Sequence, residues 1–181
     1  VYYMKVRTSN AYGSSNFSET LGVVVDNASE SDILIVQGFE RVSGTVNNFD
    51  YIIEHGEAIL SNGRTFDSAS NDAVQNGSIS LQDYDIIDWI SGEEASSTIS
   101  FSATEQNRLI EYLELGGQLF VSGSEIGWDL FANGSDDDID FYQNYFKADY
   151  IVDDAQSYAV SGTADGIFSG LAGISFDDGS Q

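Results

Sequence analysis

The stretch that decides the fold runs from Ser102 to Ser124 and reads SATEQNRLIEYLELGGQLFVSGS. Its first residue, Ser102, stands three positions before Glu105, which is the spacing of a helix capping box. The apolar residues after it recur at helical intervals: Leu109, Ile110 and Leu113. A Gly-Gly pair ends this pattern, and the apolar run 119–121 then leads into a Gly/Ser turn. The stretch predicts a helix over 102–115 that feeds a buried strand.

The same alternation of helical and strand patterns extends over the chain. Apolar runs too short to form helices predict core strands at 33–36 (ILIV) and 84–90 (YDIIDWI). Helical spacing or length predicts helices at 48–60, 70–76 and 138–150, and shorter strands are expected at 65–67, 158–160 and 174–176. This order predicts the α/β class, a three-layer sandwich with a mainly parallel sheet. Ligands of such sheets sit at the carboxyl ends of the strands.

The first 25 residues have a different pattern, with strands expected at 1–8 (VYYMKVRT) and 20–25 (TLGVVV) around a turn-rich connector. Two strands cannot bury a core alone, so this hairpin either packs on the α/β segment after it or ends a truncated domain. The segment resembles the last two strands of a fibronectin type III domain through seven residues: Tyr3, Val6, Arg7, Asn10, Gly13, Ser15 and Ser18. We therefore expect one domain fragment over 1–26 and an α/β domain over 32–181. The resemblance implies a spacer or adhesive module.

Composition excludes several function classes. The net charge is −24, since thirty acidic residues face six Lys and Arg, so neither nucleic acid nor an anionic membrane surface is an expected partner. The chain has no cysteine, which excludes disulfides, thiol nucleophiles and Cys-based metal sites. No apolar run is long enough for membrane insertion. Three readings of the acidic surface stay open: solubility in salt, stabilisation by calcium, or binding of a cationic or sugar partner.

From residue 32 onward the order of strand, YDIIDWISGEE, helix and GGQLFVSGSEIGWDL is similar to the class I glutamine-amidotransferase-like fold, a flavodoxin-like sandwich. DILIVQGFERVSG, FDSASNDAV and LFVSGSEIGWDL together resemble a domain of secreted, multidomain bacterial proteins named xanthan lyases or N-acetylmuramoyl-L-alanine amidases, where it comes after a fibronectin type III repeat. The resemblance implies an extracellular or cell-surface location. It also implies other domains of the same chain, and polysaccharide, as partners.

The turn after residue 121 is the main candidate for catalysis. A gapless match puts Ser124 where catalytic members of the resembled fold carry a cysteine, and Glu125 where many carry a histidine. The surrounding S-G-S-E-I does not fit the G-x-S-x-G elbow, and the only histidine, His55, precedes the serine. A serine needs a base to take its proton. Three readings stay open: a catalytic turn, a ligand-holding turn, or a structural turn in which Glu125 and Asp129 cap the next helix.

Other polar groups are expected near the strand ends. A binding crevice is predicted from six residues: Phe39, Glu40, Arg41, Glu93, Glu94 and Trp128. An acidic run supplies oxygens that calcium could use, without the EF-hand spacing: Asp136, Asp137, Asp138 and Asp140. No other cofactor is expected.

We expect a non-catalytic extracellular accessory, scaffold or binding module of a secreted multidomain bacterial protein, associated with carbohydrate or cell wall. The alternative is a hydrolase or lyase acting on polysaccharide or peptidoglycan, with a Ser/Glu site in the turn 122–127.

Overall fold

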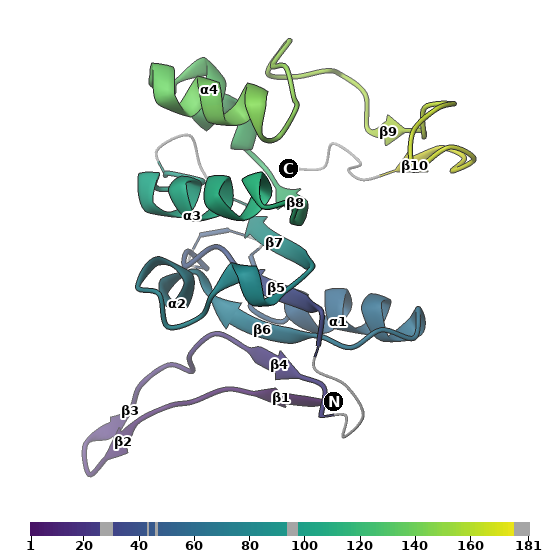
Figure 1. Ribbon diagram of the computed structural model, residues 1–181. Helices are drawn as coiled ribbons and strands as arrows, with labels where there is room; N and C mark the ends of the chain where they lie inside the picture. The colour runs from purple at the N-terminus through teal and green to yellow at the C-terminus, as the bar shows by residue number, and fades with distance from the viewer. Residues whose placement is uncertain (26–30, 43, 46, 94–97, 176–181) are drawn as a thin grey trace. The chain divides into compact units, whose positions relative to one another are not determined.

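The computed structural model describes residues 1–25, 31–42, 44–45, 47–93 and 98–175, and the chain forms two compact units, Val1–Asp149 and Tyr150–Gln181. The first unit is built on a four-stranded parallel sheet in the order β6-β5-β7-β8 (Figure 1). Its strands are β5 (Ile33–Gln37), β6 (Asp67–Ser70), β7 (Ile86–Gly92) and β8 (Gln118–Gly123). This confirms the α/β class and the parallel sheet.

Helices cover both faces of the sheet and create two hydrophobic cores. On one face α1 (Tyr51–Ser61) buries Ile52 with Ile35 of β5 and Phe66. The opposite face carries α2 (Asn71–Gln75), the 3-10 turn η1 (Leu81–Asp83), α3 (Ala103–Glu114) and α4 (Asp136–Asn144). There Trp89 of β7 is fully buried, with Phe101 packed 5.3 Å away between ring centroids. Figure 1 shows α1 on the other side of the sheet from α2 and α3, the three layers that the sequence predicts.

Local signals explain where the helices begin. The Ser102–Glu105 capping box is present at the start of α3, and Ser135 with Asp138 forms a second one at the start of α4. The helix predicted at 138–150 therefore begins earlier and ends at Asn144. The strand predicted at 65–67 is β6, shifted to Asp67–Ser70 because it pairs with β5. Residues 126–132 are helical, and Trp128–Ala132 form a π-helical turn, η2.

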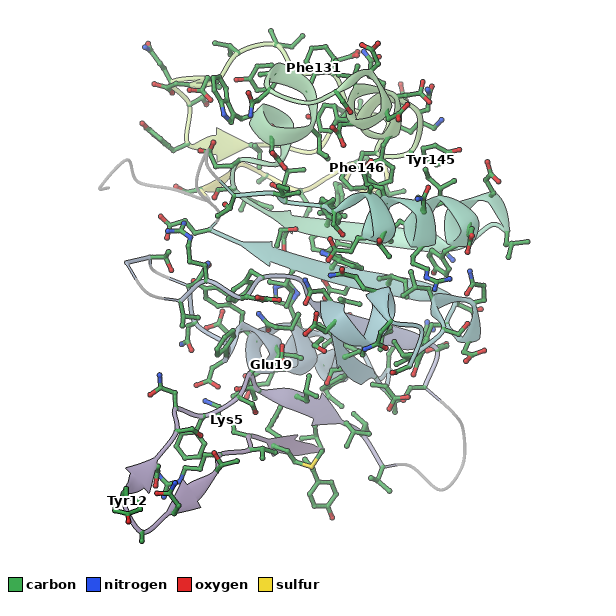
Figure 2. The ribbon with its side chains drawn as sticks, turned by 90° about the vertical axis from the view of Figure 1, so that its left-hand side faces the viewer. Lys5, Tyr12, Glu19, Phe131, Tyr145 and Phe146 are labelled. Atoms are coloured by element: carbon green, nitrogen blue, oxygen red, sulfur yellow. The ribbon has the colours of Figure 1, made fainter. Side chains whose placement is uncertain are left out.

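The N-terminal hairpin packs on the α/β sheet. Its strands β1 (Tyr2–Met4) and β4 (Leu21–Val23) are antiparallel, and β2 (Ser9–Asn10) with β3 (Gly13–Ser14) forms its tip. Backbone N–H of Val24 donates to the Phe66 carbonyl at 3.0 Å, and the Tyr3 ring lies 6.4 Å from the Phe66 ring between centroids. Tyr12 is 99% exposed at the tip, and Lys5 lies nearer the sheet (Figure 2). The fibronectin type III assignment stays a prediction.

In the second unit β9 (Ala159–Val160) and β10 (Ile174–Ser175) form an antiparallel pair, so the strands expected at 158–160 and 174–176 are present in the described part of the chain. Phe176 lies outside the described residues. Across the parts of both units that the structure describes, no helix has the length and apolar character needed to cross a membrane.

Candidate functional site

The strand order places the reversal of the sheet between β5 and β7, which is where ligands of doubly wound sheets bind. In this structure, side chains of the chain itself fill that position. Phe39, two residues past β5, is 2% exposed and stacks on Phe49 with 5.7 Å between ring centroids. Gly92 ends β7 with φ +63°, and a Cβ there would lie 2.6 Å from Phe39. The predicted crevice at these strand ends is therefore plugged by Phe39.

Asn47 completes the plug, and sequence reasoning missed it. The residue is 7% exposed, and its side-chain N–H groups donate to the carbonyls of Arg41 and Glu93, both at 2.8 Å. Its amide oxygen accepts from the Glu93 N–H at 2.5 Å. One amide thus ties together the two loops that come after β5 and β7. An asparagine in a polar loop carries no sequence signal for such a role.

The other residues of the predicted crevice fall into different surroundings. Arg41 donates from its guanidinium to the Glu93 carbonyl at 3.2 Å, so the structure brings Phe39, Arg41 and Glu93 together. Glu40 is exposed, and Trp128 is partly buried at the start of η2. Glu94 lies outside the described residues. Phe39, Arg41 and Glu93 thus belong to the packed contact between the two loops that come after β5 and β7.

The turn after β8 has its unusual backbone at Glu125. Ser124 is exposed, and its N–H donates to the Gly92 carbonyl at 2.9 Å. Glu125 has φ +63°, the left-handed region that favours glycine, directly before helical residues 126–132. A non-glycine residue held there costs about 1 kcal/mol and is a known feature of ligand-binding and catalytic turns. The left-handed backbone of this turn is therefore at Glu125 and not at Ser124.

The structural reading of the turn has Glu125 and Asp129 capping the next helix, but the turn η2 has no side-chain cap and Asp129 is bonded elsewhere. Its carboxylate accepts from the N–H of Ser100 at 2.6 Å, which ties the turn to the segment before α3. The backbone carbonyl of Glu125 accepts from the Asp129 N–H at 2.8 Å, an ordinary helical bond. Because Asp129 does not cap its own helix, the turn is fixed by a contact between segments distant in sequence.

A cavity of about 510 Å³ opens beside Glu125, between β8, α3 and α4. Its apolar lining comes from six residues: Leu113, Leu119, Val121, Ile126, Phe146 and the ring of Tyr142. The Tyr145 hydroxyl donates to Glu114 at 3.0 Å, and this bond raises the pKa of Tyr145. Figure 2 shows Tyr145 and Phe146 together beside α3. The cavity combines a carboxylate on a strained turn with tyrosine rings.

The only histidine of the chain is engaged elsewhere. His55 lies on α1, and its Nδ1 is 2.7 Å from a carboxylate oxygen of Asp88 on β7. Asp88 pairs with Phe120 in the sheet register, four residues before Ser124. At strand rise this separation is roughly 13 Å. His55 is therefore not positioned to take a proton from Ser124.

The acidic run considered for calcium forms the first turn of α4. Asp138 is partly buried there, which raises its pKa, but hydrogen bonds from Gln106 and Ser135 outweigh this and the pKa is lowered overall. Asp140 accepts from the Asn144 amide at 2.6 Å, while Asp136 and Asp137 lie in the same turn near the positive end of the helix. Among the described residues, no group of three or more His, Asp or Glu could hold a metal ion.

Comparison with protein-family models, with curated proteins and with solved structures finds no match for this chain.

Proposed function

We propose that this chain is a non-catalytic binding module of an extracellular multidomain protein, and that it binds carbohydrate in the cavity beside Glu125. The observation that carries the proposal is the lining of that cavity, in which the Glu125 carboxylate shares about 510 Å³ with Tyr142 and Tyr145. The extracellular setting rests on the resemblance to secreted bacterial domains and on the acidic, Lys-poor composition.

The chemistry of the cavity suits a sugar. Sugar hydroxyls donate hydrogen bonds to a carboxylate, and the apolar faces of sugar rings pack on aromatic rings. The volume lies within the usual range for small-ligand sites, roughly 300–1,000 Å³. A neutral sugar is favoured over a uronate, because Glu125, Glu114 and the net charge of −24 all repel an anion.

Two further observations support a module without catalysis. The reversal of the sheet, where enzymes of this architecture place their ligands, is closed by Phe39 and Asn47. His55 is hydrogen-bonded to Asp88, which faces Phe120 of β8, four residues before Ser124. His55 therefore does not serve as the base that a serine nucleophile requires.

One observation favours the alternative, a hydrolase or lyase acting on polysaccharide or peptidoglycan. The left-handed backbone of Glu125 is of the kind that persists at active sites. In that case Glu125 would act as a carboxylate base beside Ser124 or a water molecule.

Titration of the purified chain with neutral cello- and chito-oligosaccharides, measured by calorimetry, tests the proposal. E125Q keeps the size of the side chain but loses its charge. Hydrogen bonds to charged groups contribute about 1.5–3 kcal/mol, so we expect affinity to fall at least tenfold. E111Q, on the exposed surface of α3 outside the cavity lining, is the matched control and should bind as the wild type does.

Two results would contradict the proposal: no oligosaccharide binds, or E125Q binds as tightly as the wild type. Release of new reducing ends during the titration, lost in E125Q, would instead establish the alternative enzyme.

A further inference from the structure

A second cavity lies on the opposite face of the sheet and is independent of the proposed carbohydrate site. α1 covers that face over β5 but leaves Phe120 of β8 50% exposed. The resulting groove has a volume of about 520 Å³. Five apolar residues line it: Ile33, Ala58, Ile59, Ile86 and Phe120. This wall would bury the apolar body of a ligand.

The polar centre of the groove is the His55–Asp88 pair. Asp88 is 8% exposed, and one of its carboxylate oxygens lies 2.7 Å from His55 Nδ1. Because a carboxylate only accepts hydrogen bonds, the pair fixes a proton on Nδ1 and leaves Nε2 as the ring nitrogen for a ligand. Among the described residues, Nε2 has no hydrogen-bond partner, and neither does the second, buried oxygen of Asp88.

The charges around this pair are mainly negative. Glu54 lines the groove beside His55. The hydrogen bond that His55 donates to Asp88, together with the charges of Asp88 and Glu54, raises the pKa of His55 despite its burial. Arg64 at the far end is already paired with Asp32. The groove therefore offers a negative potential next to an apolar wall, and a net charge of −24 strengthens it.

We propose that this groove binds an organic ammonium ion, a primary amine on an apolar or aromatic body. The ammonium group lies between Glu54 and the His55–Asp88 pair and donates to Nε2 of neutral His55. The apolar body packs against Ile59, Ile86 and Phe120. A proton on His55 competes with this ligand, so binding strengthens above the pKa of the imidazole.

Because the chain has a single histidine, the imidazole signals of His55 in a proton–carbon NMR spectrum are unambiguous. The probes are phenethylamine, phenylacetate and methylamine, added at equal concentration and ionic strength at a series of pH values that spans the titration of His55, whose pKa lies above the ordinary value of an imidazole. Phenethylamine should shift the His55 signals saturably and lower the midpoint of their pH titration. Phenylacetate lacks the cation and methylamine lacks the apolar body, so neither should do so.

Two variants test the two halves of the site. E54Q removes one carboxylate and F120S removes the exposed part of the wall, and each should weaken phenethylamine at least threefold. E57Q, on the exposed surface of α1 outside the groove lining, and L115S, at an exposed position after α3, are the matched controls and should bind normally. The proposal is wrong if methylamine acts as strongly as phenethylamine, if both E54Q and F120S bind as the wild type does, or if no probe shifts His55.

Discussion

Replacing Asn47 with alanine should destabilise the protein more than its position in a loop suggests. Asn47 is 7% exposed and forms three hydrogen bonds across the loops that come after β5 and β7. Each such bond contributes about 1 kcal/mol net, and N47A removes all three, while the Glu93 carbonyl keeps its bond from the Arg41 guanidinium. We expect a loss of about 3 kcal/mol in the free energy of unfolding. The free energy of unfolding of a typical protein is about 5–15 kcal/mol, so a loss of this size should be easy to measure.

A second substitution at the same position tests whether the side-chain N–H donors of Asn47 are required. N47D keeps an oxygen that can accept from the Glu93 N–H, but it places a carboxylate oxygen where the amide donates to two carbonyls. At neutral pH it should therefore destabilise at least as strongly as N47A, although the side chain keeps its size. N107A, at an exposed position of α3, is the control and should stay within about 0.5 kcal/mol of the wild type.

Urea denaturation monitored by tryptophan fluorescence measures all three variants, since Trp89 is fully buried in the sheet. The midpoint should fall for N47A and N47D with an unchanged slope. A loss under about 1 kcal/mol in N47A would refute the reasoning, because the three bonds would then add almost nothing to loop closure. Stability equal to the wild type in N47D would show that the amide donors are not used.

Three other contacts, each buried or at a helix cap, lead to further predictions. G56A should lower the melting temperature, because a Cβ there would lie 2.5 Å from the Phe66 ring. Overpacking of this kind costs about 1–3 kcal/mol, which exceeds the gain of about 1 kcal/mol in helix propensity. An unchanged or higher melting temperature would contradict this prediction. The pKa of His55 is raised in the folded state, so the stability from its bond to Asp88 is complete below about pH 6.5 and is lost as the pH rises through the folded value. Urea midpoints should show this fall above about pH 6.5 in the wild type but not in H55Q, and identical profiles would count against it. S102A removes a helix cap and should cost about 1 kcal/mol by the same assay, whereas a change below about 0.3 would mean that the cap is dispensable.

The elements that could be predicted are those whose signals are local. The capping box and apolar spacing of α3 lie within about a dozen residues, and the structure reproduces the predicted helix to within one residue at each end. The predicted position of β6 was displaced because DSAS has little strand propensity of its own and becomes a strand only by pairing with β5.

The contacts that position side chains were out of reach because they join residues distant in sequence. Asn47 bonds to Glu93 across 46 positions, and His55 bonds to Asp88 across 33. One signal was present: Asp88 is an acid inside the apolar run YDIIDWI, and a buried acid requires a partner. The left-handed Glu125 could not be expected, since glycine is the usual residue for that backbone.

Tension applied across the N-terminal ribbon would load its backbone bonds one at a time. Tyr2 faces Val23 and Met4 faces Leu21, so the chain enters and leaves the ribbon at the same end. A force that pulls residue 1 away from the sheet would separate β1 from β4 one residue pair at a time, while the Val24 N–H stays bonded to the Phe66 carbonyl. Release of about twenty residues would lengthen the chain by roughly 70 Å before the parallel sheet is strained. The ribbon would thus act as an extensible tether with a defined stop.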